Sequence, residues 1–262
     1  MLIKNSILLY YLILNKKYMK HDANWIKQPI NHNNLFKSYE DKYGINSDFS
    51  KWQEIIFADK DVRDNLSKAL NAIDLDQGNV LDIGINNALE IGAMKDLKGL
   101  INWDNIKITG IDLSRTALKI AKNNLKDIKH ELLFGNILEF SGQDIDSDQK
   151  ISLADNHFDA CFAITSLQST GIYNDNFTSF ANNLIKKMKN KSYFLVMVPN
   201  CYIENRQLKE GGAFNAERQA PDKDFAPNFV KKFGLILQNN NYKVESFGDK
   251  FLFILAKRYA KK

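Results

Sequence analysis

The stretch VLDIGINNALE, residues 80–90, decides the fold class of this 262-residue chain. It opens with a short, mostly apolar run up to Ile85, which is typical of a buried strand. A helical pattern follows from about Ala88 to Leu100. Gly84, between the two, permits a tight turn and lets a ligand approach the backbone closely. The stretch therefore predicts a strand, a ligand-binding loop and a helix in succession.

The same alternation continues along the chain. Further strands are expected at IKITGID, HELLFGNI, HFDACFAITSL and KSYFLVMVPN, which are residues 106–112, 130–137, 157–167 and 191–200. Amphipathic helices separate them, and two closing strands at 242–248 and 250–258 predict an antiparallel hairpin. We therefore expect an α/β fold, with a doubly wound, mostly parallel sheet of seven strands that helices cover on both faces.

Three parts are expected along the chain. Residues 1–19 hold an apolar run that is shorter than the roughly 20 residues of a membrane-spanning helix, and no small-residue cleavage site follows it. We expect this leader to be either unstructured or a mis-called start upstream of Met19. Residues 20–75 predict a helical lid or cap, although core packing explains the same aromatic residues. Residues 76–262 predict the α/β domain, with an insertion at 201–227.

Composition limits the partners. The net charge is +5, and the basic residues are scattered along the chain, so RNA or another anionic substrate is permitted but not required. The two cysteines form no CxxC pair and the four histidines lie apart, so no metal site is expected. Both cysteines lie among apolar residues, where buried packing is a more ordinary role than nucleophilic attack. So few cysteines fit a cytoplasmic protein.

Polar residues stand where the expected strands end. Asp112 closes the second strand, and a carboxylate there could accept hydrogen bonds from both ribose hydroxyls of a nucleotide. Asn136 follows the third strand and could meet the edge of an adenine. Because ligands bind at the carboxyl ends of parallel strands, these residues are expected at one crevice. Alternatives remain for each: Asp112 as a cap of the helix after Ser114, Asn136 as a turn residue, and Asp82 as an acceptor for loop amides.

At these positions the sequence resembles the class I S-adenosylmethionine-dependent methyltransferases. The resemblance covers about residues 79–200, with a compatible helix and hairpin up to 258. In that family an acidic residue and an apolar residue precede a Gly-x-Gly-x-Gly loop. Here Asp82 and Gly84 match the pattern, whereas Asn86 and Ala88 replace the second and third glycines. Asparagine tolerates a left-handed backbone better than most residues, so Asn86 is expected to preserve the turn.

The resemblance implies a Rossmann-like fold, S-adenosylmethionine as the cofactor, and methyl transfer to an acceptor that is either a small molecule or RNA. The cofactor-binding positions that it implies are Asp82, Gly84, Asn86, Asp112, Leu113, Asn136, Ile137 and Thr165. Two other functions remain open. The altered loop could mark a methyltransferase-like binding module without catalysis. A nucleotide-dependent oxidoreductase would share the general fold, but the closing hairpin and the missing GxGxxG count against it.

Candidate residues for contact with the acceptor lie near the ends of the later strands: Gln168, Asn200 and Tyr202. Methyl transfer from a sulfonium is an in-line displacement, so the protein mainly supplies positioning and a dry site. A general base is needed only if the acceptor must lose a proton. His157 begins a strand and therefore lies at the wrong end for this role.

Overall fold

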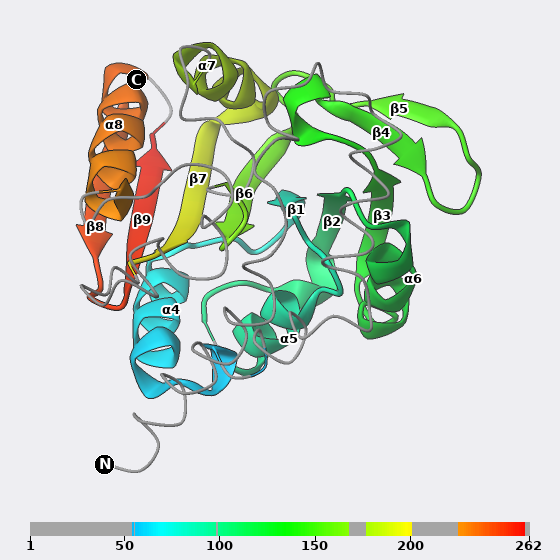
Figure 1. Ribbon diagram of the computed structural model, residues 1–262, viewed down its shortest axis with the longest axis horizontal. Coiled ribbons are helices and arrows are strands. Elements are labelled where there is room, and N and C mark those ends of the chain that lie inside the picture. The colour runs from blue at the N-terminus through cyan, green and yellow to red at the C-terminus, as the bar shows by residue number, and fades with distance from the viewer. Residues whose placement is uncertain (1–53, 55, 98, 168–176, 201–224, 260–262) are drawn as a thin grey trace, which may run out of the picture.

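The computed structural model describes residues 54, 56–97, 99–167, 177–200 and 225–259. Within these ranges one sheet passes through the molecule, with the strand order β5-β4-β3-β2-β1-β6-β7-β9-β8 (Figure 1). The strands are β1 (Gly78–Ile83), β2 (Ile106–Asp112), β3 (Lys129–Phe134), β4 (Ser141–Asp144), β5 (Lys150–Ser152), β6 (Phe158–Ile164), β7 (Met188–Pro199), β8 (Tyr242–Phe247) and β9 (Phe251–Arg258). The helices are α4 (Lys60–Ala72), α5 (Leu89–Asp96), α6 (Arg115–Asn124), α7 (Phe177–Lys187) and α8 (Phe225–Asn239), with short 3-10 turns η2 (Trp103–Asn105) and η3 (Ile137–Glu139).

The central strands run parallel, as the sequence predicts. β1 pairs in parallel with β2 on one side and with β6 on the other, so the order of the strands reverses at β1. β3 and β7 extend the parallel part of the sheet outward. The last strand, β9, is antiparallel to both of its neighbours, β7 and β8. A crevice for a ligand is therefore expected where β1, β2 and β6 end.

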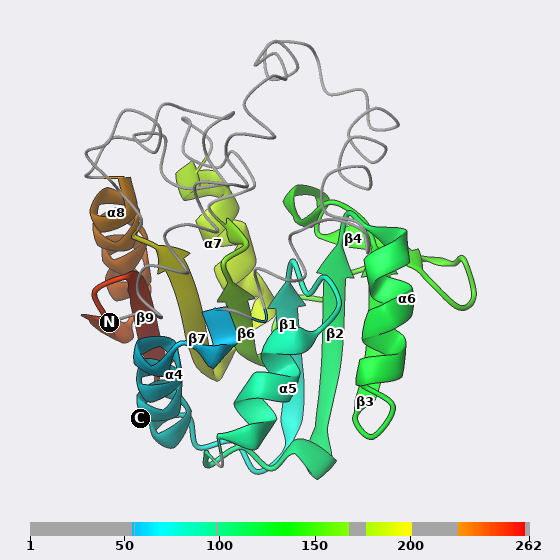
Figure 2. The ribbon, with the colours of Figure 1, turned by 60° about the horizontal axis from the view of Figure 1, so that its bottom comes forward.

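Helices cover both faces of the sheet. In Figure 2 the helices α4, α5 and α6 lie on the near face, and α7 lies behind the strands. Val80 and Ile108 share one buried cluster with residues of α4, α5 and α6. Leu81 and Ile111, from the same two strands, lie in a second cluster with α7 and α8. Successive side chains alternate between the two faces of a strand, so even-numbered residues of β1 and β2 face α5.

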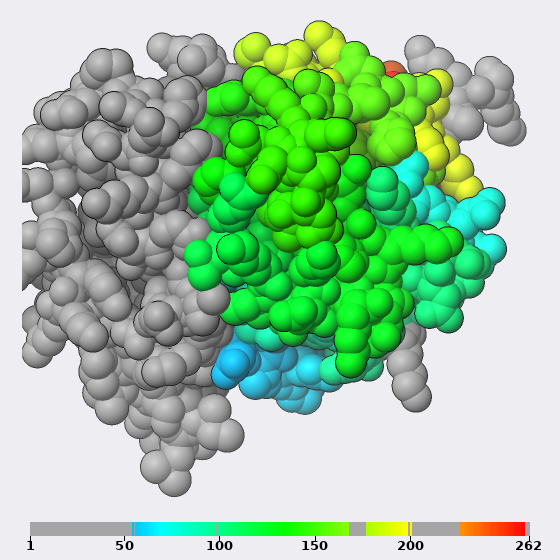
Figure 3. All heavy atoms as spheres, turned by 90° about the vertical axis from the view of Figure 1, so that its right-hand side faces the viewer, coloured from blue at the N-terminus to red at the C-terminus, as the bar shows by residue number. Residues whose placement is uncertain are grey.

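The sheet holds two more strands than the seven expected. β4 and β5 form within the polar, acidic segment after β3, which the sequence pattern indicates as a loop. The turn between them is closed by the Asp144 carboxylate, which accepts hydrogen bonds from the backbone N–H groups of Asp146 and Ser147. This edge carries ion pairs from α6 to the same turn, Lys122 to Asp146 at 2.5 Å and Arg115 to Asp148. Figure 3 shows the edge in green.

The helix α4 belongs to the core of the α/β domain. Leu66, Leu70 and Ile73 are fully buried in the cluster that also contains Val80 of β1. Asp59 caps this helix by accepting from the N–H of Asp61 at 2.8 Å. The expected leader, most of the expected lid and most of the expected insertion at 201–227 lie outside the described residues. No helix in the described ranges is long and apolar enough to cross a membrane.

Candidate active site

The loop after β1 has the backbone shape that a glycine-rich loop would have. Gly84 lies at φ 72°, and both residues in place of the other two glycines also have positive φ, 46° at Asn86 and 60° at Ala88. Non-glycine residues adopt this left-handed region rarely, and asparagine does so more readily than alanine. The substitutions at Asn86 and Ala88 therefore leave the turn intact, as the sequence predicts for Asn86.

Local hydrogen bonds hold this loop in place. The Asn86 side chain accepts from the N–H of Asn87 at 2.9 Å, and the Asn87 side chain accepts from the N–H of Leu89 at 3.3 Å. From α6, the Asn124 side chain donates to the Asn87 carbonyl at 2.8 Å. Asparagine side chains are well suited to such short-range bonds with the backbone. These bonds tie the loop to itself and to α6.

Asp112 joins this loop to the end of β2. One carboxylate oxygen accepts from the N–H of Asn86 at 2.9 Å, and the other accepts from the N–H of Ser114 at 2.8 Å. Ser114 itself caps α6 by accepting from the N–H of Ala117 at 3.0 Å. Asp112 thus fixes the geometry of both loops. Each carboxylate oxygen has more than one lone pair, so bonds to ribose hydroxyls are compatible with these contacts.

Asp82 has a different environment. Its side chain is fully buried, and neither carboxylate oxygen has a hydrogen-bond partner. The alternative that it binds loop amides is therefore wrong. Burial raises the pKa of Asp82 well above its usual range, and the charge of Asp112 raises it further. A buried carboxyl without a partner costs free energy unless it is protonated or meets a donor, which fits a role in binding a ligand.

The end of β6 closes the site from the other side of β1. A Cβ atom on Gly84 would lie 2.5 Å from the Cβ of Ser166, so only glycine fits between this loop and β6. Thr165 is buried at φ 55°, an unusual value for a β-branched residue. Its N–H donates to the Met197 carbonyl at 2.9 Å, which holds the strained residue at the edge of the crevice.

Asn136 lies at the end of β3, where it acts as a cap. Its side chain accepts from the N–H of Leu138 at 3.0 Å and thereby starts the short turn η3. The interpretation of Asn136 as a turn residue is therefore confirmed. Ile137 is buried in the core beneath it, and Leu113 is partly exposed beside Asp112. The described ranges thus bring all eight predicted cofactor-binding residues to the ends of β1, β2, β3 and β6.

Of the candidates for contact with the acceptor, only Asn200 lies in the described residues. Its side chain donates to the Asp249 carbonyl and its N–H donates to the Lys250 carbonyl, both at 2.8 Å. Asn200 therefore links the end of β7 to the turn between β8 and β9. Gln168 and Tyr202 lie outside the described residues. His157 precedes β6 at its amino end, away from the loop after β1. The described part of the chain holds no group of His, Cys, Asp and Glu residues suited to a metal ion.

The segment that builds this site matches a known family. Residues 81–196, from β1 to β7, match the family model of a methyltransferase domain. Over these residues the chain carries a methyltransferase domain. S-adenosylmethionine is therefore its cofactor, and this methyltransferase has the Rossmann-like fold that the order of its strands predicts. A search among curated proteins finds none that matches the chain.

Solved structures show the same fold. An S-adenosylmethionine-dependent methyltransferase from Aquifex aeolicus superimposes with a TM-score of 0.50 at 16% identity, over 88% of this chain and 100% of the other. A Listeria monocytogenes protein assigned to the same class gives 0.51 at 15% identity, over 75% and 96%. A Bordetella parapertussis protein assigned as exported gives 0.52 at 12% identity, over 93% and 81%. At such identities the likeness concerns the fold alone.

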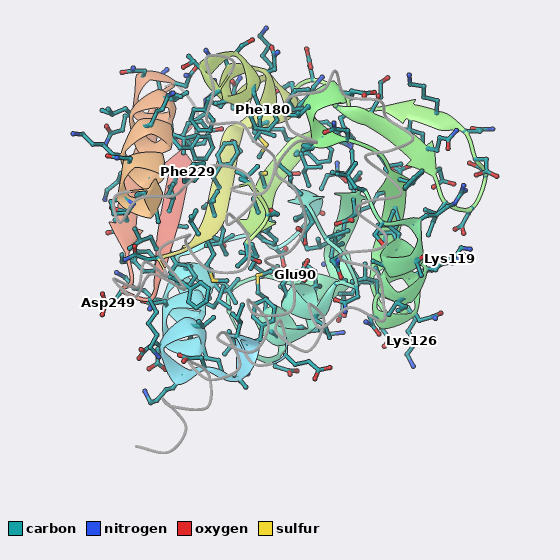
Figure 4. All side chains as sticks on the ribbon, viewed as in Figure 1. Glu90, Lys119, Lys126, Phe180, Phe229 and Asp249 are labelled. Carbon is teal, nitrogen blue, oxygen red and sulfur yellow. The ribbon has the colours of Figure 1, made fainter. Side chains whose placement is uncertain are left out.

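Glu90 is the site residue that the sequence interpretation missed. It lies in the first turn of α5 and is buried, at 2% exposure. Figure 4 places it near the centre of the view, beside α5. The available signal is its spacing, because Glu90, Ala93, Met94 and Leu97 lie on one helical face. A carboxylate in an otherwise apolar stripe is unusual enough to mark a functional residue.

Proposed function

We propose that this methyltransferase binds S-adenosylmethionine at the carboxyl ends of β1 and β2 and transfers its methyl group to a small molecule or to RNA. The observation that carries the proposal is the left-handed backbone at Asn86 and Ala88, which keeps the cofactor loop in shape without its second and third glycines. The buried carboxylates fit the group as well. Asp112 binds the loop after β1 with one oxygen and the N-terminus of α6 with the other, and Asp82 has oxygens without partners.

In this proposal Asp112 binds the ribose hydroxyls, Asn136 contacts the adenine, and Asp82 faces the methionine portion. Gly84, Asn86, Leu113, Ile137 and Thr165 supply the walls and the loop around it. When bound, the cofactor supplies a methyl group that its sulfonium already activates. The protein's part is to hold that group in line with the acceptor and to exclude water. The described residues at the site offer carboxyls as proton acceptors, and the acceptor decides whether one is needed.

The first experiment measures equilibrium binding of S-adenosylmethionine to the full chain. We expect saturable binding with a dissociation constant below the millimolar range. If no binding is detected at millimolar cofactor, the chain is a methyltransferase-like module without catalysis.

A second experiment identifies the acceptor. The full chain is incubated with methyl-labelled cofactor and with cell extract divided into RNA, protein and small-molecule fractions. We expect label in the RNA or the small-molecule fraction, and label in protein alone would contradict this part of the proposal. The cytoplasmic location is also part of the proposal and rests on the few cysteines. Cys161 is free and fully buried, and burial raises the pKa of its thiol, as expected of a packing residue and not of a nucleophile.

A further inference from the structure

In the described part of the chain, buried side-chain polar atoms without hydrogen-bond partners lie around the loop after β1. Among the described residues they are both carboxylate oxygens of Asp82, Oε2 of Glu90 and Oγ of Ser166. Asp82 is in β1, Ser166 is in contact distance of the loop that follows β1, and Glu90 begins the next helix. Elsewhere buried polar side chains pair, as the Ser192 and Tyr242 hydroxyls do at 2.8 Å. Atoms without partners at a single point indicate a place for a ligand.

The fold explains why Asp82 and Glu90 face each other. Leu81 and Ile83 point to the α7 side of the sheet, so the alternation along β1 turns Asp82 to the opposite face, toward α5. Glu90 is buried on the same side of α5 as Met94, which packs in the cluster on that face of the sheet. Three elements, β1, α5 and the end of β6, thus direct polar atoms into one buried space.

The charges around the pair favour a cation. Besides the pair itself, the charged group that raises both pKa values is Asp112 on β2, and burial together with Asp82 raises the pKa of the Cys161 thiol on β6. No Lys, Arg or His of the described ranges forms an ion pair or a hydrogen bond with either carboxyl. Burial raises the pKa of Glu90 well above its usual range, and Asp82 raises it further; a hydrogen bond from the N–H of Glu90 itself acts in the opposite direction, and Asp112 adds a smaller increase.

The chemistry of the space narrows the choice of cation. Two carboxyl groups and a hydroxyl offer several oxygen acceptors, which suits an ammonium group with its three N–H donors. The same residues form no group suited to a metal ion within the described part of the chain. The proposed cofactor carries an ammonium group on its methionine portion. A role for Glu90 in binding that group therefore rests on the proposed function.

We propose that Glu90 is a second cofactor-positioning residue, which receives this ammonium group together with Asp82 and releases a proton to solvent when it binds. One carboxyl O–H bond of the pair breaks and its proton passes to water or buffer, while the ammonium group keeps all of its own protons. Cofactor binding is then linked to pH: it tightens as pH rises, until the carboxyl pair of the free protein is already ionised. Glu90 lies outside the Gly-x-Gly-x-Gly pattern, so the proposed contact with the ammonium group is not part of the loop motif.

The test uses S-adenosylhomocysteine, which keeps the ammonium group, and its analogue with hydrogen in place of the amino group. Both are titrated by calorimetry into the full chain at pH 6.5, in two buffers of different ionisation enthalpy, so that the protons released can be counted. We expect the parent compound to release a substantial fraction of one proton and the analogue to release none. This comparison needs no variant and therefore does not depend on how a mutant folds.

The variant Glu90→Gln tests whether Glu90 is the source of the released proton. We expect its affinity for S-adenosylhomocysteine to fall about tenfold, equal to about 1.4 kcal/mol, its proton release to vanish, and its affinity for the analogue to stay the same. Glu245→Gln is the matched control, since Glu245 is exposed on β8, and it should behave as wild type. Equal affinities and equal proton release in wild type and Glu90→Gln would overturn the role of Glu90. If the wild type binds neither compound, the proposed function fails as well.

Discussion

Gly84 is the position at which the fold and the site depend most directly on a missing side chain, and Gly84→Ala tests both. An alanine there must adopt φ 72°, which costs about 1–2 kcal/mol for an L-residue. Its Cβ would also lie 2.5 Å from the Cβ of Ser166, and such overpacking of a filled interior costs about 1–3 kcal/mol. We therefore expect Gly84→Ala to lower the free energy of unfolding by about 2–5 kcal/mol.

A double-mutant cycle separates the two costs. Ser166→Gly removes the clashing atom, so Gly84→Ala combined with Ser166→Gly should recover the overpacking part, about 1–3 kcal/mol, and leave the backbone strain. Urea denaturation followed by circular dichroism measures all four proteins, provided that each unfolds in one cooperative transition.

Gly92→Ala is the control, because its Cβ meets nothing within 4 Å on the exposed side of α5. Alanine favours a helix over glycine, so this variant should gain about 0.5–1 kcal/mol. A loss below about 1 kcal/mol in Gly84→Ala, or no recovery with Ser166→Gly, would refute the close contact between the loop and β6.

Three further predictions concern the carboxylates and the altered loop. Asp112→Ala leaves the N–H groups of Asn86 and Ser114 without this acceptor, so the free energy of unfolding should fall by about 1–3 kcal/mol. Cofactor affinity should fall at least tenfold, and an unchanged dissociation constant in folded protein would exclude the ribose role of Asp112. Glu90 has a raised pKa in the folded state, so its protonated form stabilises the fold below a pH of about 4 and this contribution is lost as pH rises through the raised pKa. The melting temperature of Glu90→Gln should therefore decline less than that of wild type between pH 5 and 8, and parallel curves would contradict the shift. Ala88→Gly relieves about 1–2 kcal/mol of backbone strain. It also loses a buried methyl group and gains chain entropy in the unfolded state, and each of these costs about 0.5–1 kcal/mol of stability. The free energy of unfolding and the cofactor affinity should therefore stay close to wild type, and a loss of stability above about 2 kcal/mol would contradict the left-handed backbone at Ala88.

Apolar runs in the sequence were sufficient to predict the central part of the fold. Strands that are buried on both faces, such as residues 106–112 and 157–167, read as continuous hydrophobic segments, and the helices between them require a parallel sheet. Their order along the chain places Asp112 and Asn136 at one edge. β4 and β5 could not be predicted in this way, because edge strands of polar residues bury too few side chains to leave a hydrophobic pattern.

The site was predictable where it depends on a motif and not where it depends on burial. Asn86 carries a known tolerance for positive φ, whereas Ala88 adopts the same conformation only because the surrounding loop imposes it. Whether Asp82 binds loop amides or a ligand depends on which donors the folded chain brings near it. None of the described residues donates a hydrogen bond to its carboxylate. The burial of Glu90 likewise depends on how α5 packs on the sheet, which no local sequence pattern predicts.

The place of β9 has a consequence for how this protein is made. Residues 251–258 enter the sheet between β7 and β8, although both of those strands are synthesised earlier. On the ribosome, the edges of β7 and β8 therefore lack their shared partner until residues 251–258 have emerged, at a synthesis rate of about 5–20 residues per second. Such edges are sites of aggregation. Truncation just before Phe251 would leave the edge of β7 open permanently.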